Sequence, residues 1–242
     1  MGKKLTTGML RQLHELDAAR NDVGDHIQEL IRRLTDGGVK VNQNDQFFAQ
    51  TKVFWDKGWG TALGLESLKV YRDSVRDLAG KIPERPPVDY LNKLILVDRR
   101  VQLTDACRMA GLKYHGSDKT FKPYDEKVAK KHGDAYWMWC QDGRRNQNKK
   151  PSVCRTEFAK IPGAGSEVGL DEFEFVAMYA QDPSVIGTKE NPRFIDLPGA
   201  VRADVPDNIA CGGGWNGEPW CWCGSAVPEF GSASRWEFGP QS

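Results

Sequence analysis

Three prolines within seven residues, in the segment KIPERPP at 81–87, are the strongest constraint on how this chain can fold. Proline fixes φ and removes a backbone hydrogen-bond donor, so the segment disfavours helix and is typical of an extended linker. The chain before it has helical apolar spacing, whereas the chain after it mixes helical patterns, alternating strands and Gly- and Pro-rich turns. We therefore predict an α+β protein with a helical module at 1–80, a linker at 81–87 and an α+β domain with short antiparallel strands at 88–242.

The helical module is marked by a seam with 4-3-4-3 spacing within residues 6–34. Arg20 is its one polar member, and the full series is Met9, Leu13, Leu16, Arg20, Val23, Ile27, Leu30 and Leu34. Such spacing suits a coiled coil or an antiparallel helical hairpin. Two alternatives stay open: the seam packs on a second helix of the chain, predicted at 65–79, or it joins copies of the chain into a homo-oligomer.

Helical spacing recurs after the linker. Residues 88–100 form an apolar element that is either a helix or a buried strand, and 103–112 fits a helix that ends at Gly111. Residues 169–183 predict a helix with acidic residues in its first turn, where the helix dipole favours them. Its apolar face is expected to contain Phe173, Val176, Ala177 and Ala180.

Strand patterns begin in the middle of the chain. Residues 134–141, DAYWMWCQ, alternate with the period of two that a strand requires, and Asp142-Gly143 is a turn signal. Residues 151–158 fit either a partner strand or the start of a helix. From 191 onwards, short aromatic strands separated by glycine and proline are expected.

Charge is distributed unevenly along a chain whose net charge is only +1. Residues 112–160 carry 12 basic and 6 acidic groups, and 161–242 carry 4 and 12. Within the basic aromatic segment 127–150, cations that suit phosphates stand beside aromatic rings that suit bases, a combination found in single-strand nucleic-acid platforms. The candidate binding residues are Tyr136, Trp137, Trp139, Arg144, Arg145, Lys149 and Lys150. The alternative is a solvated basic rim beside aromatic residues of the core.

Three of the six cysteines lie in ACGGGWNGEPWCWCGSA, at 210–226. Asn216-Gly217 is a strong two-residue hairpin signal. A turn there places Cys221 and Cys223 on one face of the hairpin and Cys211 on the other, because opposed residues share a face. That register does not bring three thiols to one tetrahedral ion, although a bulge in the glycine run would reset the faces. The three cysteines are weak metal candidates, and no cofactor is predicted.

Enzyme signatures are missing from the sequence. It contains no H-E-x-x-H, G-x-S-x-G or Walker pattern, and no G-x-G-x-x-G after a predicted strand. The absence of a motif from one sequence is weak evidence, so whether the protein is an enzyme stays open, and the sequence favours a role without catalysis. The sequence also lacks a secretory signal and an apolar run long enough for a membrane span, so we expect a cytoplasmic protein with reduced thiols and no membrane partner.

Four stretches resemble a group of uncharacterised bacterial proteins: YWMWCQDGRRNQNKKPSVCRTEF, GLDEFEFVAMYAQDPSVI, RFIDLPGA and FGSASR. The resemblance covers about 88–240 and departs from the group at 196–200, where DLPGA stands for DLPGS. The resemblance implies that this part of the chain folds as one unit, and it implies no catalytic activity or ligand. The functional hypothesis is therefore a non-enzymatic binding or interaction module. The alternatives are a nucleic-acid-binding protein that uses 127–150, and an enzyme without a recognisable motif.

Overall fold

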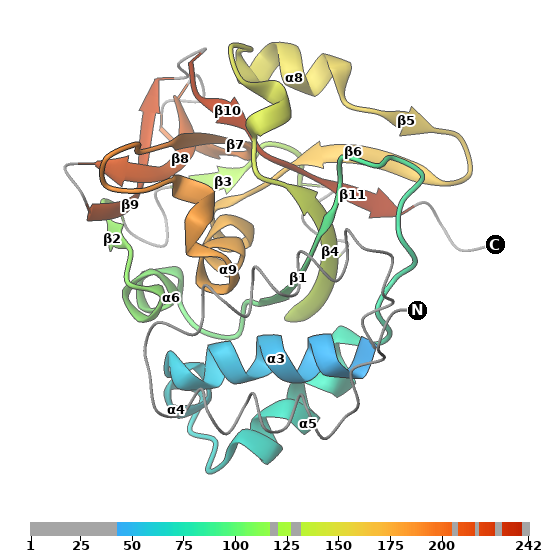
Figure 1. The fold of residues 1–242 in the computed structure, drawn as a ribbon, viewed down its shortest axis with the longest axis vertical. Helices are drawn as coiled ribbons and strands as arrows, with labels where there is room; N and C mark the ends of the chain where they lie inside the picture. Colours follow the sequence, from blue (N-terminus) through green and yellow to red (C-terminus); the bar gives the residue numbers. More distant parts are fainter. Residues whose placement is uncertain are drawn as a thin grey trace, which may run out of the picture. The chain divides into compact units, whose positions relative to one another are not determined.

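The computed structural model describes residues 43–116, 121–126, 132–204, 208–215, 218–225 and 229–238. The chain divides into two compact units, Met1–Gln46 and Phe47–Ser242. The seam at 6–34 lies outside the described residues, so the coiled-coil and helical-hairpin interpretations stay predictions. Within the second unit, helices and two largely antiparallel sheets confirm a mixed α+β protein (Figure 1).

Among the described residues, three helices precede the proline-rich segment: α3 (Gln43–Asp56), α4 (Trp59–Ala62) and α5 (Leu68–Ala79). The helix predicted at 65–79 is confirmed by α5, although it begins three residues later. The reason is Ser67, whose hydroxyl accepts a hydrogen bond from the Val70 N–H over 3.3 Å and caps the helix. Tyr71 and Val75 form its buried face.

Hydrogen bonds onto Asp98 join α4 and α5 to the first sheet. Trp59 Nε1 donates to the Asp98 carbonyl oxygen over 3.4 Å, and the Tyr71 hydroxyl donates to the Asp98 carboxylate over 2.9 Å. The guanidinium of Arg100 pairs with the same carboxylate at 2.7 Å. Helices and sheet share one hydrophobic core, and the predicted linker, 81–87, runs between α5 and the first strand inside the Phe47–Ser242 unit.

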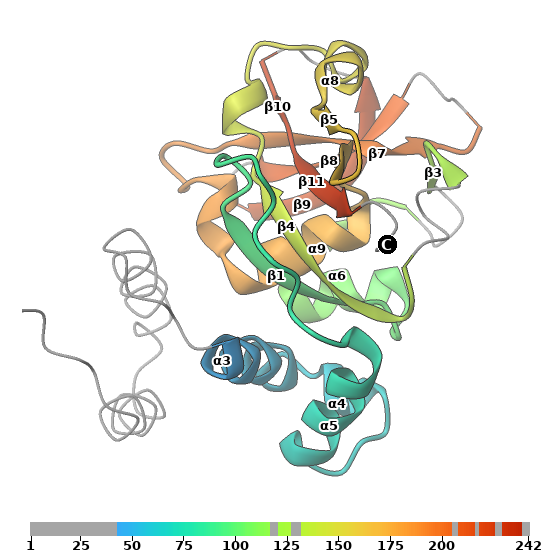
Figure 2. The same cartoon turned by 90° about the vertical axis from the view of Figure 1, so that its right-hand side faces the viewer.

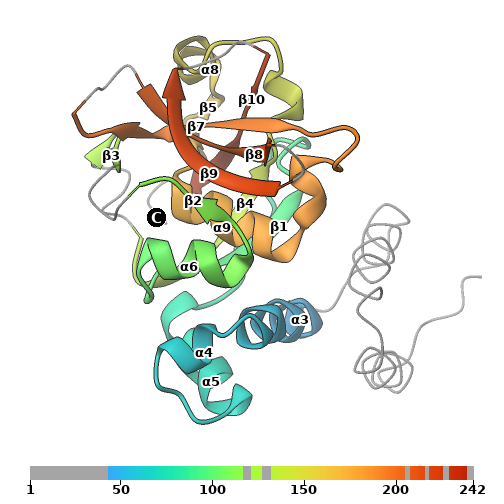
Figure 3. The same cartoon turned by 90° about the vertical axis from the view of Figure 1, so that its left-hand side faces the viewer.

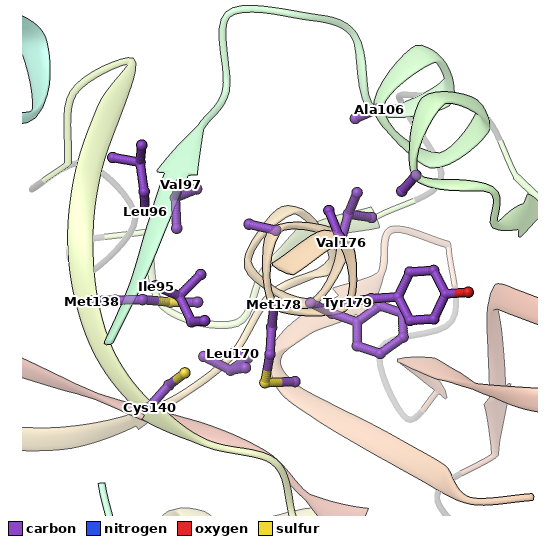
Figure 4. Close-up of a cluster of buried hydrophobic side chains, with 14 of the residues drawn as sticks. Ile95, Leu96, Val97, Ala106, Met138, Cys140, Leu170, Val176, Met178 and Tyr179 are labelled. Atoms are coloured by element: carbon purple, nitrogen blue, oxygen red, sulfur yellow. The ribbon is translucent and has the colours of Figure 1, made fainter. Parts of the chain in front are cut away.

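The first sheet is antiparallel, with the order β1-β4-β11-β6-β5. Its strands are β1 (Lys93–Asp98), β4 (Ala135–Gln141), β11 (Ser234–Phe238), β6 (Gly165–Gly169) and β5 (Lys160–Ile161). The apolar element at 88–100 is thus a strand. All of β1 after Lys93 is buried, because the sheet is covered on both faces. The Phe47 ring of α3 packs 6.2 Å from that of Trp137, and Ile95 and Met138 point toward a central helix (Figure 4).

The second sheet has the order β10-β7-β8-β9-β2, with β3 paired to β7. Its strands are β10 (Gly231–Ser232), β7 (Phe194–Arg202), β8 (Asn208–Trp215), β9 (Glu218–Ser225), β2 (Lys113–Tyr114) and β3 (Phe121–Pro123). The short outer strands β10 and β2 pair in parallel with β7 and β9, and the other pairs are antiparallel. The hairpin of β8 and β9 has the predicted register, with Trp215 opposite Glu218 and Cys211 opposite Trp222.

The central helix is α9 (Glu172–Gln181), which lies between the two sheets (Figures 1 and 2). A capping box starts it, in which Asp171 accepts from the Glu174 N–H and Glu174 accepts from the Asp171 N–H. Every residue from 174 to 181 is buried, so this part of α9 is buried on all sides and not only on the single apolar face predicted from the sequence. A Cβ on Gly212 would overlap the Phe175 ring, so the glycine run of β8 lets α9 approach the sheet closely.

The other short helices lie at the ends of strands. The helix predicted at 103–112 is α6 (Leu103–Ala110), which ends at Gly111 with a φ of 86°. Residues 151–158 form a helix rather than a strand, α8 (Pro151–Glu157), because Pro151 suits the first helical position. The 3-10 helices η1 (Arg144–Asn146) and η2 (Pro183–Ile186) complete the described fold.

Candidate binding surface

Four cations of the predicted binding set, Arg144, Arg145, Lys149 and Lys150, gather at η1 and the start of α8, and we call this set the basic corner. All four side chains reach solvent, and Arg144 is 62% exposed. In Figures 1 to 3, α8 lies at the end of the molecule away from α5. The corner is therefore well separated from the helices that precede the proline-rich segment.

Glycine and amide contacts fix the backbone of the basic corner. Gly143 has a φ of 88°, and a Cβ there would lie 2.5 Å from the Gly231 carbonyl oxygen. The Asn146 side-chain amide donates to the Ser232 carbonyl oxygen over 2.8 Å. Gln141 donates to the same oxygen over 2.9 Å and accepts from the Gly143 N–H over 2.5 Å. The cations thus project from a rigid turn clamped to β10.

Each arginine of the corner also has a local partner. The Arg145 guanidinium lies 3.7 Å from the centroid of the Tyr90 ring and 3.6 Å from the Glu167 carboxylate. Arg144 Nε lies 3.5 Å from an Asp142 oxygen. These contacts use only some of the five N–H donors of each guanidinium, so both arginines keep further N–H groups for a ligand.

The lysines differ from each other. Lys149 forms an exposed ion pair of 2.5 Å with Glu157, which is worth little because solvent screens it. Lys150 is exposed and occupies the N-cap position of α8 without a side-chain capping bond. A phosphate would compete at Lys149 only with a solvent-exposed ion pair. At the arginines it would compete with the contacts to Tyr90, Glu167 and Asp142.

The aromatic residues of the predicted set lie elsewhere. Tyr136 and Trp137 are buried in β4, and the Tyr136 hydroxyl donates to Glu174 over 2.8 Å. Trp139 is half-buried, and its Nε1 donates to the Pro83 carbonyl oxygen over 3.1 Å. Sequence alternation placed Tyr136 and Trp137 on opposite faces, but both faces of β4 are covered. The structure therefore brings the cations together and keeps the Tyr136 and Trp137 rings in the interior.

A buried ionic network in the first sheet escaped the sequence analysis. Arg235 is 3% exposed and pairs with Glu174 and, at 2.5 Å, with Glu237. Burial disfavours the Glu237 carboxylate, but hydrogen bonds from His132 and Arg235 outweigh it and lower its pKa to about 2. The only sequence signal for part of this network is the D-x-x-E capping-box pattern that starts at Asp171. The network links β4, β11 and α9.

The Cys211 and Cys221 thiols lie on opposite faces of the hairpin, as its register requires. Cys211 packs with Val201, Ile209 and Trp222, whereas Cys221 lies in the main core beside the Cys107 thiol. The side chain of Cys223 lies outside the described residues. In the described part of the chain, no group of three His, Cys, Asp or Glu residues has a geometry that could hold a metal ion.

The five cysteines with described side chains are all buried. Burial raises the pKa of Cys140 and of Cys154, and a hydrogen bond to Cys107 together with burial raises that of Cys221. A raised pKa keeps a thiol protonated at neutral pH, and the protonated thiol is a poor nucleophile. These three cysteines therefore behave as small apolar core residues.

No protein-family model, curated protein or solved structure matches the chain. No helix of the described residues has the length and apolar character that a membrane crossing needs.

Proposed function

We propose that the protein is a non-enzymatic binding module whose recognition surface is the basic corner, and that its partner is the phosphate backbone of a nucleic acid. The observation that carries the proposal is the clamped turn at Gly143, from which four cations project into solvent. A rigid site loses little conformational entropy when it binds, so more of the interaction energy appears as affinity.

Guanidinium and ammonium groups suit phosphates. Arginine forms bidentate hydrogen bonds with phosphate oxygens, and lysine adds a point charge. Most of the affinity in such contacts comes from counterion release, which makes binding strongly salt-dependent and largely independent of base sequence. Because Tyr136 and Trp137 are buried, the proposal rests on cations alone and expects no base stacking on β4.

The placement of the ionisable groups at the first sheet supports a binding role over a catalytic one. In the buried network at the first sheet, Arg235 pairs with Glu174 and Glu237. Asp98 pairs with Arg100 where the helices join that sheet. Catalytic acids and bases need contact with substrate, whereas these groups are committed to the core. Their perturbed environment is explained by structural ion pairing.

The test is titration of a fluorescent oligothymidine with the full chain at several salt concentrations. We expect measurable affinity that falls steeply with salt, and at least about a tenfold loss in the double variant Arg144→Glu with Arg145→Glu. Lys69→Glu with Arg108→Glu makes the same change in net charge at two highly exposed positions on α5 and α6, and should change affinity less than about twofold. Equal losses in the two double variants would mean that net charge, rather than the basic corner, attracts the nucleic acid.

Two further controls complete the experiment. Lys149→Gln with Lys150→Gln removes charge without reversing it and leaves the Arg145 contact with Tyr90 in place, so it reports on the corner if the arginine variant unfolds. An equimolar duplex competitor distinguishes a preference for single strands from general phosphate binding. Heparin binding without nucleic-acid binding would assign the corner to another class of polyanion and overturn the proposal.

Self-association through residues 6–34 is a separate proposal supported by the 4-3-4-3 spacing of the seam. Light scattering of the full chain over a hundredfold concentration range tests it. We expect a mass above that of one chain, restored to one chain by Leu16→Glu with Leu30→Glu. A monomer at the highest concentration would exclude it.

A further inference from the structure

Asp196 is a buried carboxyl beneath the basic corner. It lies in β7 with an exposed fraction of 0%. Its Oδ1 accepts a hydrogen bond from the Cys211 thiol over 3.5 Å, and its Oδ2 is buried without a donor among the described residues. A buried polar atom without a partner costs free energy, so the position requires a physical explanation.

Arg155 of α8 lies close enough to Asp196 for their charges to interact, and it also has a buried N–H group without a partner. Its Nε donates to the Pro198 carbonyl oxygen over 3.0 Å, and its guanidinium carbon lies 3.8 Å from the centroid of the Tyr124 ring. Its Nη2 is buried and has no acceptor in the described structure. Arg155 and Asp196 attract each other electrostatically, but these two described side chains share no hydrogen bond.

Three elements present groups to Asp196. The second sheet contributes the Cys211 thiol from β8 and the Ser232 hydroxyl from β10, whose residue is paired with Asp196 in the β7–β10 register. Helix α8 contributes Arg155 and the thiol of Cys154, on which the Asp196 charge also acts. Arg155 is the one cation among these groups, so it is the natural partner for an ionised Asp196.

Two contacts connect this cluster to the basic corner. The Ser232 carbonyl oxygen accepts the side-chain hydrogen bond of Asn146 in η1. The Cys154 thiol donates to the Lys149 carbonyl oxygen over 3.9 Å. A shift of α8 toward β7 would therefore move the turn that presents the cations.

We propose that Asp196 is a pH-sensitive switch beneath the basic corner, with Arg155 as its moving partner. When the carboxyl is neutral, Arg155 remains on the Tyr124 ring. When the carboxyl loses its proton to solvent, it draws the guanidinium into an ion pair and pulls α8 toward β7. The switch itself is inferred from the contacts of Asp196 in β7 and Arg155 in α8. Its effect on nucleic-acid binding rests on the proposed function.

The protonation change of Asp196 is expected near neutral pH. Burial raises the pKa of Asp196 to about 7, against the opposing effects of the Cys211 hydrogen bond and the Arg155 charge. An ion pair would satisfy Oδ2 and Nη2 together, which compensates for burying the charge. The carboxylate also adds a negative charge under the corner, so ionisation is expected to weaken phosphate binding.

The switch itself is tested on the wild-type chain without any ligand. Carboxyl carbon NMR of Asp196 between pH 5 and 8 should show a titration in that range. Hydrogen exchange of peptides from α8, corrected for the intrinsic effect of pH, should differ between pH 5.5 and 8 in the wild type. Asp196→Asn, which keeps an acceptor at Oδ1, should remove that difference. A carboxyl signal that is constant from pH 5 to 8, or an α8 difference that survives in Asp196→Asn, would overturn the switch.

Regulation is tested by oligothymidine affinity at the same two pH values and constant ionic strength. We expect about fivefold weaker binding at pH 8 than at pH 5.5 in the wild type. Asp196→Asn should show no such change. Arg155→Gln, which removes the moving partner but keeps the charge of Asp196, should show a smaller change than the wild type. Binding that is tight at both pH values would overturn the regulation and leave the proposed function intact. No binding at either pH, together with a titrating Asp196, would overturn the proposed function and leave the switch intact.

Discussion

Replacing Asp196 by asparagine is expected to change how the stability of the fold depends on pH. The buried carboxyl has a pKa of about 7 in the folded chain, against an ordinary value of 3.8. A group whose pKa is raised by folding favours the folded state at low pH, and this contribution is lost as the pH rises through the folded value. Asparagine keeps the shape and the Oδ1 acceptor but cannot titrate.

The size of the effect follows from the two pKa values. One pKa unit corresponds to about 1.4 kcal/mol, and linkage between values of 3.8 and about 7 gives a loss of about 2–3 kcal/mol between pH 5 and 8. The free energy of unfolding of the wild type should therefore fall by about 2–3 kcal/mol more than that of Asp196→Asn over this range. The histidines contribute equally to both proteins and cancel in the difference.

Urea unfolding followed by tryptophan fluorescence at pH 5, 6, 7 and 8 measures both proteins at one ionic strength. Asp105→Asn makes the same chemical change on the exposed surface of α6, where it pairs with Arg108, and should keep the wild-type pH dependence. Parallel curves for the wild type and Asp196→Asn would refute the assignment of a neutral, buried carboxyl at this position.

Three further changes test the rest of the fold. Gly212→Ala should destabilise the protein by about 1–3 kcal/mol or more in chemical denaturation, because its Cβ overlaps the Phe175 ring, whereas Gly163→Ala in an open turn should report only its own backbone strain. Glu174→Gln should cost about 3–5 kcal/mol, since it leaves Arg235 buried with one partner fewer, and a cost below about 1 kcal/mol would contradict a buried network. The five described cysteines should resist a thiol reagent in the native state and react once the chain is unfolded, and rapid native labelling at any of them would contradict their burial.

Local signals in the sequence predicted the hairpin of β8 and β9 well. The prediction rests on the Asn216-Gly217 sequence signal and on the alternation of adjacent residues, both of which are read from a short stretch, and the pairing of Trp215 with Glu218 agrees with it. The same holds for α6, which ends at a glycine with positive φ, and for α5. The choice between helix and strand at 88–100 depended on burial of both faces, which no local pattern specifies.

The candidate site was predictable only in part. Its cations are adjacent in the sequence, so Arg144, Arg145, Lys149 and Lys150 could be proposed together. The separation of these cations from Trp137 depends on what covers both faces of β4, and that involves α3 and α9 from distant parts of the chain. Asp196 and Arg155 come together only through the packing of α8 on β7, so no spacing rule could have paired them.

The salt dependence of oligothymidine affinity tests the proposed function most directly. Each phosphate contact on a single strand contributes about −0.7 to the slope of log affinity against log salt, so four cations give a slope of about −3 at most. We expect the wild type to approach this value and Arg144→Glu with Arg145→Glu to fall to about half of it or less. A slope near zero, or the same slope in both proteins, would contradict nucleic-acid recognition by the basic corner.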